Sequence, residues 1–458
     1  MKKGTTPVRQ NWSLGEFMND NITSVTALYD SHVHWLMTGE KKSYFDVQYF
    51  KTLSAIPENP FEPKNYRGDW IFGFGWDDSQ LKAVTPFAEL DRLNSVSPIC
   101  FIKKDAHSCM LNSAALKIIL PLIENIPALA PFIERDGNSQ PTGVLKESAF
   151  YSIYSHIPAL SNSEIRRCLL EAQDYFLKKG FTHIRDMTCS LAQWDVLKAM
   201  QKSGELKLFA EINFNAETRT HALETILPFV QKESIDTHSN LKIKGVKIFS
   251  DGSLGSNTAW LIENYNGSDQ NGYNLWSNDD MSEVMKLCWQ SNLEFSVHTL
   301  GDKAVDNVVD IARSLYAQKI RGYLNLEHVQ LVAPETIVKM KSLFVRCHMQ
   351  PSHWLSDKKF LKEKLSPKTM KNLFAWEALR RAKVPISFGS DSPIEDADVE
   401  LTHRALEDSK AAGIEELNAP FFEFYSYPNP TAEWSKAKTY LDDYKPVNVE
   451  LPPAHTGN

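Results

Sequence analysis

Two histidines, two positions apart, close the first β-rich stretch of the chain. His32 and His34 end the run ITSVTALYDSHVH, and alternation along a strand sends both imidazoles to the same side. Neutral imidazoles side by side are good ligands for zinc and similar divalent metals. Taken alone, an H-x-H pair fits a solvated or buried structural pair about as well as it fits a metal site.

Three further polar side chains end other apolar stretches. His298 ends LEFSV, His328 ends YLNLE, and Asp391 follows the apolar residues of SFGSDSP. Taken singly, each histidine is best explained as a core or capping residue, and Asp391 as the N-cap of the next helix. Taken together, they require several separate strands to end in metal-competent groups, and coincidence explains that less well.

Lys247 lies inside the apolar run VKIF, where an unpaired ammonium group is costly. One explanation is a lysine that extends its amine to solvent or pairs with Asp251. The alternative is a lysine kept neutral by its surroundings, which would react with CO₂ and become a carboxylated lysine that bridges two metals.

The elements that must position these groups alternate between strand and helix. Eight β-rich runs are separated by amphipathic segments of helical length, of which SEIRRCLLEAQDYFLKKG is one. This alternation predicts parallel β-α-β units and an α/β fold, a (β/α)₈ TIM barrel. An open doubly wound sheet is disfavoured, because no glycine-rich phosphate loop follows the first strand. Active sites in such barrels form at the carboxyl ends of the strands, where all the candidate residues fall.

The interval between the first and second runs is too long for a loop and contains strands of its own. We therefore predict a large insertion after the first strand, a subdomain over the barrel mouth. The tail after Pro393 is rich in aromatic residues and proline and shows no clear element. The predicted organisation is residues 1–34 as N-terminal segment and first strand, 35–161 as inserted subdomain, 162–405 as the rest of the barrel, and 406–458 as C-terminal tail.

Composition narrows the choice of partner. The 458 residues are 42% hydrophobic and 23% charged with a net charge of -7, which argues against nucleic acid as the main partner. The six cysteines are scattered without a C-x-x-C pair, as expected of buried thiols in a reducing compartment. We find no apolar region behind the N-terminal charges and no uninterrupted membrane-length stretch. We expect a cytoplasmic protein that acts on a small-molecule substrate, with no membrane partner.

Several motifs in sequence order resemble those of one superfamily. DSHVH, GVKIFSDGSLGS, VHTLGD, LEHVQLV and FGSDSP resemble the amidohydrolase superfamily, and more closely its amidohydrolase 3 branch, which includes N-substituted formamide deformylases. The resemblance runs from about Asp30 to Pro393. GWDD, KKDAHSCMLNSAAL and TGVLKES also resemble the insertion of that branch.

The resemblance implies a metal centre with one or two divalent ions, most often zinc. His32 and His34 would bind the more buried ion, and a carboxylated Lys247 would bridge it to a second ion. The residues implied to bind metal are His32, His34, Lys247, His298, His328 and Asp391. Of these, Lys247, His298 and Asp391 would also have catalytic roles, Asp391 as the proton shuttle.

The implied reaction is hydrolysis of a C–N bond, of amide or N-formyl type, in a small molecule. A metal-activated hydroxide would attack the carbonyl, and Asp391 would pass the proton to the leaving amine. Ester, lactone or phosphoester hydrolysis on the same scaffold is an alternative. A catalytically inactive metal-binding protein is disfavoured, because all six ligand positions are filled.

Further residues receive supporting roles. Candidates for substrate contact are His107, Glu147, Trp76 and Gln350. We expect Asp251 and Asp302 to orient the lysine and the histidine near them. Three other histidines match no motif and are taken as structural: His183, His348 and His353.

The chain departs from the family at its two ends. Family members usually carry a flanking β-sandwich, but only a short stretch precedes Asp30, and the closing glycine-rich segment is not visible. We predict a sandwich that is reduced or absent. A barrel without this layer exposes apolar surface, which a homo-oligomer would bury.

Overall fold

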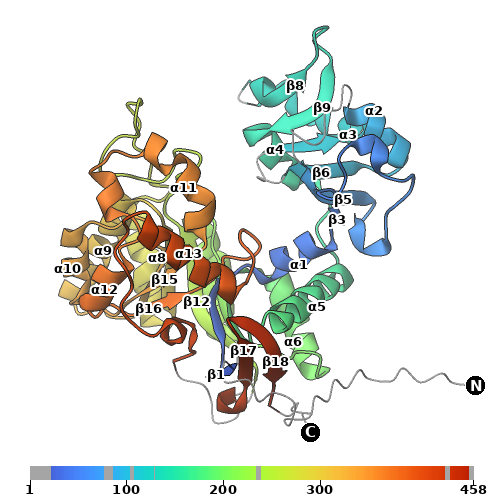
Figure 1. The fold of residues 1–458 in the computed structure, drawn as a ribbon. Coiled ribbons are helices and arrows are strands. Elements are labelled where there is room, and N and C mark those ends of the chain that lie inside the picture. Colours follow the sequence, from blue (N-terminus) through green and yellow to red (C-terminus); the bar gives the residue numbers. More distant parts are fainter. Residues whose placement is uncertain are drawn as a thin grey trace, which may run out of the picture. The chain divides into compact units, whose positions relative to one another are not determined.

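The computed structural model describes residues 22–76, 86–103, 108–127, 129–233, 239–428 and 434–452. These residues form two compact units (Figure 1). Of the described residues, the barrel unit takes in those within 1–33, 175–188 and 204–458, and the inserted unit takes in those within 34–174 and 189–203.

The barrel unit contains an eight-stranded sheet that closes on itself. Its strand order is β16-β15-β14-β13-β12-β11-β10-β2, the paired strands run parallel, and a parallel bridge between Val33 and Ser392 joins the last strand to the first. Each of the eight predicted runs contains one of these strands, so the predicted barrel is confirmed. The strands are β2 (Tyr29–Val33), β10 (His183–Cys189), β11 (Phe209–Asn215), β12 (Leu241–Phe249), β13 (Glu294–Thr299), β14 (Leu324–His328), β15 (Val345–Met349) and β16 (Ile386–Phe388).

Helices lie between consecutive strands of the barrel along the chain, and α9 (Asp302–Ala317) shows how such a helix packs. In α9 the buried residues Val305, Val308, Ala312 and Leu315 recur every three or four positions, which makes one continuous apolar face. The helices between and after these strands, of which α6 and most of α5 belong to the inserted unit, are α5 (Asn162–Lys178), α6 (Leu191–Lys202), α7 (Leu227–Lys232), α8 (Asn278–Gln290), α9 (Asp302–Ala317), α10 (Pro334–Met340), α11 (His353–Lys364), α12 (Trp376–Arg381) and α13 (Val399–Ala411). Shorter helical turns are η5 (His221–Ile226), η6 (Thr369–Asn372), η7 (Phe421–Tyr425) and η8 (Trp434–Lys436).

The inserted unit has its own sheet, with strand order β3-β5-β6-β7-β9-β8 and β4 paired to β5. Alternate residues of β5 and β6 enter two different apolar clusters, so both faces of this sheet are covered. Its strands are β3 (Phe45–Asp46), β4 (Tyr66–Arg67), β5 (Trp70–Trp76), β6 (Ile99–Lys103), β7 (Ser108–Leu111), β8 (Ile133–Arg135) and β9 (Pro141–Lys146). Besides α6 and most of α5, its helices and turns are α1 (Trp35–Ser43), α2 (Pro86–Leu93), α3 (Ser113–Ile123), α4 (Glu147–Ser152), η1 (Leu53–Ala55), η2 (Pro63–Asn65), η3 (Ala130–Phe132) and η4 (Ile153–His156).

A third, antiparallel sheet joins the two ends of the described chain. Strand β1 (Ile22–Thr26) pairs with β17 (Lys438–Asp442), which pairs with β18 (Lys445–Glu450). The predicted first run therefore splits into β1 and β2, and the break falls at Ala27, whose φ is +52°. The tail, predicted to lack a clear element, carries two strands of this sheet, β17 and β18. Asp443 and Tyr444 make the turn with positive φ and no glycine, which hid the hairpin.

The amino-terminal end of the barrel is held by an ionic network. The Glu294 carboxylate accepts hydrogen bonds from Arg346 at 2.9 Å and from Asn325 at 2.9 Å, and it lies 2.8 Å from the Lys244 ammonium. Burial alone would raise the pKa of Glu294, but the two cations hold it at about 2. Glu294 is therefore ionised at neutral pH and stabilises this end of the sheet.

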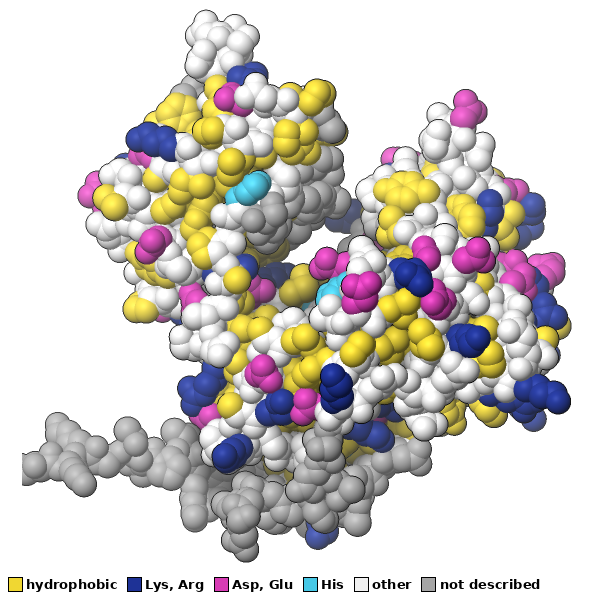
Figure 2. Space-filling view, turned by 180° about the vertical axis from the view of Figure 1, so that it is seen from behind, with side chains coloured by type: hydrophobic (Ala, Val, Ile, Leu, Met, Phe, Trp, Pro, Cys, Tyr) yellow, Lys and Arg dark blue, Asp and Glu magenta, His cyan; other side chains and the backbone are white. Residues whose placement is uncertain are grey.

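Acidic and basic side chains lie side by side on each unit in the face that Figure 2 shows, as expected for a modest net charge of -7. All six cysteines are buried, and none of them forms a disulfide. Within the described ranges, we find no helix whose length and apolar character would let it cross a membrane.

Candidate metal centre

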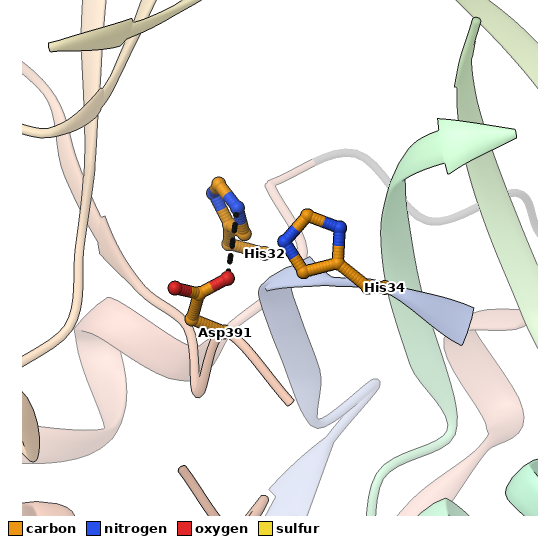
Figure 3. Close-up of side chains that lie close together, drawn as sticks. All are labelled: His32, His34 and Asp391. Carbon is orange, nitrogen blue, oxygen red and sulfur yellow. Dashed lines mark ion pairs between the residues drawn. The ribbon is translucent and has the colours of Figure 1, made fainter. Parts of the chain in front are cut away.

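His32, His34 and Asp391 come together at the carboxyl ends of β2 and β16 (Figure 3). Each offers one ligand atom, and these atoms lie within 4.8 Å of one another. The His32 Nε2 atom lies 3.3 Å from the Asp391 carboxylate, and the Asp391 backbone N–H donates to the His32 carbonyl oxygen at 2.8 Å. Gly389 makes this close approach of the two strands feasible, since a Cβ there would lie 2.6 Å from the His32 backbone nitrogen.

Two further histidines lie beside this group, on the neighbouring strands β13 and β14. The His328 ring centroid is 4.7 Å from that of His32 and 4.5 Å from that of His298. Burial lowers the pKa of His298 to about 3, with a further contribution from the Lys247 ammonium, and burial also lowers the pKa of His328 well below its usual value. Both imidazoles are therefore neutral, which is the form that binds metal.

Hydrogen bonds determine which nitrogen of each histidine stays available. His328 Nδ1 donates to the Gln350 side-chain oxygen at 2.8 Å, and His298 Nε2 donates to the Gly252 carbonyl oxygen at 3.1 Å. The opposite nitrogens, Nε2 of His328 and Nδ1 of His298, therefore keep their lone pairs for a metal.

Lys247 lies in β12 with no exposed surface, and its amine has no hydrogen-bond partner among the described residues. The expected alternatives, a solvent-exposed amine or a pair with Asp251, are therefore not what the structure has. Its nearest aromatic contact is the Phe249 ring, whose centroid is 4.4 Å from Nζ. Burial lowers the pKa of Lys247 to about 8, although Glu327 and Asp391 partly oppose the shift. A sizeable fraction of this amine is neutral near physiological pH, the form that reacts with CO₂.

A buried network of charged side chains contacts His32 at Nδ1, the ring nitrogen opposite the one that lies near Asp391. The His32 Nδ1 atom lies 2.7 Å from one carboxylate oxygen of Glu327, and Arg185 donates to the other oxygen at 2.9 Å. Burial would raise the pKa of Glu327, but the Arg185 guanidinium and the His348 and His32 imidazoles hold it well below its usual range. The Glu327 carboxylate therefore fixes the Nδ1–H tautomer of His32, which directs Nε2 toward Asp391.

The other predicted site residues have the following places. Gln350 accepts from His328, so its described contacts support the histidine ligand. Asp251 accepts from the backbone N–H groups of Trp260, Leu300 and Gly301 and lies 3.9 Å from His298 Nε2, so its described contacts include the histidine. Asp302 accepts from the Ile262 backbone and the Asn372 amide.

The candidates in the insertion are placed differently. Trp76 lies in an apolar cluster of the inserted unit, and its indole N–H donates to the Phe101 carbonyl oxygen at 3.0 Å. Its contact with substrate stays a prediction. Glu147 begins α4, but its side chain lies outside the described part of the chain, as does all of His107.

Three residues of the centre were not predicted from the sequence. His353 was taken as structural, yet its ligand atom groups with those of His328 and Asp391 within 4.8 Å. Its position four residues after the end of β15 is the signal that could have found it. Glu327 precedes His328 in the same strand, and Arg185 lies in β10. Only their partners across the barrel reveal what these two do.

The residues present fit a divalent metal. Imidazole nitrogens and a carboxylate form a donor set that suits zinc and related ions. The buried Lys247 amine and the buried His298 Nδ1 atom have no hydrogen-bond partner in the described ranges, and such atoms are costly unless another group satisfies them. A metal and a carbamate on the lysine would satisfy both.

The fold and this centre together define a TIM-barrel protein with a metal-competent site at the strand ends. A family model for the amidohydrolase family matches residues 25–405. The chain therefore belongs to the amidohydrolase family, and the resemblance seen in its motifs is confirmed.

Three similar proteins illustrate this relationship. Protein LONG AFTER FAR-RED 3 of Arabidopsis thaliana is 28% identical over 397 residues, which covers 81% of this chain and 66% of that protein. YtcJ of Bacillus subtilis is 28% identical over 388 residues, covering 81% of this chain and 70% of its own length. A solved structure, described as an uncharacterized metal-dependent hydrolase from Pyrococcus furiosus, is 25% identical with a TM-score of 0.69, and the match covers 84% of this chain and 76% of that one.

Proposed function

We propose that this chain is a metal-dependent hydrolase that cleaves a C–N bond, of amide or N-formyl type, in a small molecule. The observation that carries the proposal is the convergence of His32, His34 and Asp391 on one point, beside a buried lysine with no hydrogen-bond partner among the described residues. Family membership and the likeness to a metal-dependent hydrolase support it.

The residues of the centre would hold one or two ions. His32, His34 and Asp391 form one group, and Lys247, His298 and His328 would hold a second ion if the lysine is carboxylated. A bound divalent ion of this kind supplies Lewis acidity, which polarises a carbonyl group and lowers the pKa of water. Since His298 and His328 are neutral, they add no charge that would oppose binding.

Asp391 is the group that moves the proton. Its carboxylate accepts a proton from the attacking water and passes it to the leaving nitrogen. One C–O bond forms and the C–N bond breaks, so the products are a carboxylic acid and an amine. The nitrogen must be protonated because an amide anion is a very poor leaving group. Asp391 suits this role because its backbone is tied to His32 and its φ of +60° fixes the direction of the side chain.

The proposal is tested with the purified full chain. Metal content is measured by elemental analysis, and hydrolysis is assayed on panels of amides, N-formyl amines, esters, lactones and phosphoesters. We expect bound zinc or a similar ion, and cleavage of amide or N-formyl substrates. Activity confined to esters, lactones or phosphoesters would replace the C–N assignment by that alternative.

Two variants test the residues. His32→Ala and Asp391→Asn are each expected to lower kcat/KM by about 10³-fold or more, because they remove a metal ligand and the proton-transfer group. The matched controls are His403→Ala, whose imidazole packs on Tyr444, and Asp269→Asn, at an exposed loop position. A His32→Ala protein with full activity and full metal content would show that the site is misassigned.

A further inference from the structure

His353 begins α11, the helix that follows β15, and β15 carries none of the predicted metal ligands. The residue is only 8% exposed, and its Nε2 atom lies 3.5 Å from an Asp391 carboxylate oxygen. Within the described ranges, this buried nitrogen has no hydrogen-bond partner. A buried polar atom that is aimed into a site and left unsatisfied marks a place where a ligand atom belongs.

Two roles fit such an atom, and they need opposite tautomers. A metal ligand must present a lone pair at Nε2, whereas a donor to substrate must present an N–H there. The hydrogen bonds on the other side of the ring decide between them.

The amide of Gln330 fixes the tautomer of His353. Its nitrogen lies 3.0 Å from the Asp357 carboxylate and 3.3 Å from His353 Nδ1. The carboxylate accepts from the amide, so the NH₂ group, and not the oxygen, lies between the two partners. One N–H donates to Asp357 and the other to Nδ1. Because Nδ1 accepts, the ring proton of His353 is on Nε2.

The comparison with the expected ligands supports this assignment. His328 and His298 each donate a hydrogen bond from one ring nitrogen to an oxygen atom, and this leaves a lone pair on the other ring nitrogen. In His353, by contrast, the nitrogen that faces the supporting glutamine is Nδ1, and it accepts a hydrogen bond from the Gln330 amide. His353 therefore has the opposite arrangement, although the same ligand-atom geometry places it in a metal-competent group.

We propose that His353 is a substrate-binding and catalytic residue whose Nε2–H donates to the carbonyl oxygen of the substrate. This hydrogen bond strengthens as negative charge develops on that oxygen during attack at the carbonyl carbon. The inference rests on the proposed hydrolase function and adds to it the group that recognises the carbonyl. It assigns no metal to His353.

Kinetics of two variants test the role. His353→Phe keeps a ring of similar size but has no donor, and we expect kcat/KM to fall by about 10²–10³-fold, as for loss of one donor to a developing oxyanion. His353→Gln restores an N–H and is expected to recover part of this loss. Metal content should match that of the wild type in both variants. Loss of metal in both would show that His353 is a ligand, and an unchanged kcat/KM would also overturn the proposal.

The tautomer is tested without any activity measurement. In protein labelled with ¹⁵N-histidine, the His353 resonances are assigned by their absence in His353→Gln, and we expect coupling of the ring proton to Nε2. A proton on Nδ1 would overturn the inference. If the wild-type protein hydrolyses esters but no amide or N-formyl compound, the C–N assignment fails, and the same kinetic comparison on the ester carbonyl still tests His353.

Discussion

The most informative perturbation of this protein is Glu327→Gln, because that carboxylate joins the metal centre to the barrel core. One of its oxygens lies 2.7 Å from His32 Nδ1, and the other accepts from Arg185 at 2.9 Å. The Arg185 and Glu327 side chains are 1% and 0% exposed. A glutamine of the same shape can accept on one side only, so its NH₂ group must face either His32 or the Arg185 guanidinium, and both are donors.

The burial and contacts of Glu327 determine how much Glu327→Gln should lower the free energy of unfolding and the metal affinity. Loss of one partner from a fully buried ion pair leaves an uncompensated charge on Arg185, which costs about 3–5 kcal/mol of unfolding free energy. Loss of the group that orients a histidine ligand lowers metal affinity by about 10–100-fold. The matched control is Glu415→Gln. Glu415 pairs with Arg381 at 2.7 Å, but those side chains are 52% and 56% exposed, so the expected cost is below about 1 kcal/mol.

Two assays separate these effects. Urea unfolding of the metal-free protein gives the stability difference, and competition with a chromophoric chelator gives the metal affinity. The Glu327→Gln protein should lose both stability and affinity, and the Glu415→Gln protein should lose neither appreciably. Equal urea midpoints for the two variants, or unchanged metal affinity in Glu327→Gln, would refute the reasoning.

Three further outcomes are expected. Metal content of the wild type should rise with bicarbonate in the medium. The Lys247→Ala protein should bind less metal, and its metal content should not change with bicarbonate. Equal metal content in the wild type and Lys247→Ala would rule out the carbamate hypothesis. Gln350→Leu removes the acceptor that orients His328 and should lower metal affinity by about 10–100-fold in the chelator assay, and no change would mean that the ring needs no such support. The Glu294 carboxylate, with a pKa of about 2 against the usual 4.5, contributes stability above pH 4.5 that is lost as pH falls toward 2. In urea unfolding, Glu294→Gln should lower stability by about 3 kcal/mol at pH 7 and lose this acid dependence, and a variant as acid-sensitive as the wild type would contradict this.

The barrel could be predicted because its strands are buried on both faces. Such strands form short apolar runs, and each run of the sequence supplies one strand of the barrel. The tail hairpin could not be predicted, because β17 and β18 are short, half-exposed strands whose turn contains no glycine. Its pairing with β1 depends on residues more than 400 positions apart, which no local pattern records.

The grouping of His32, His34 and Asp391 could be predicted from the sequence, but the contacts that support these residues could not. His32, His34 and Asp391 follow apolar runs, so their position at strand ends was visible in the sequence. Glu327 lies inside such a run, where a charged residue gives no sign of its partner. Arg185 likewise shows its role only when β10 and β14 are placed in one barrel. The parts of a site that depend on distant partners are the parts that sequence patterns leave open.

The histidines of this centre show why residue type alone does not assign a role. His328 and His353 both lie within reach of Asp391, and either would count as a metal ligand by distance. Their partners differ, since Gln350 presents an oxygen to His328 and Gln330 presents a nitrogen to His353. Two glutamine side chains turned in opposite senses therefore place the ring proton of His328 on Nδ1 and the ring proton of His353 on Nε2. On this argument, the outer partners decide which imidazoles bind metal and which one meets the substrate.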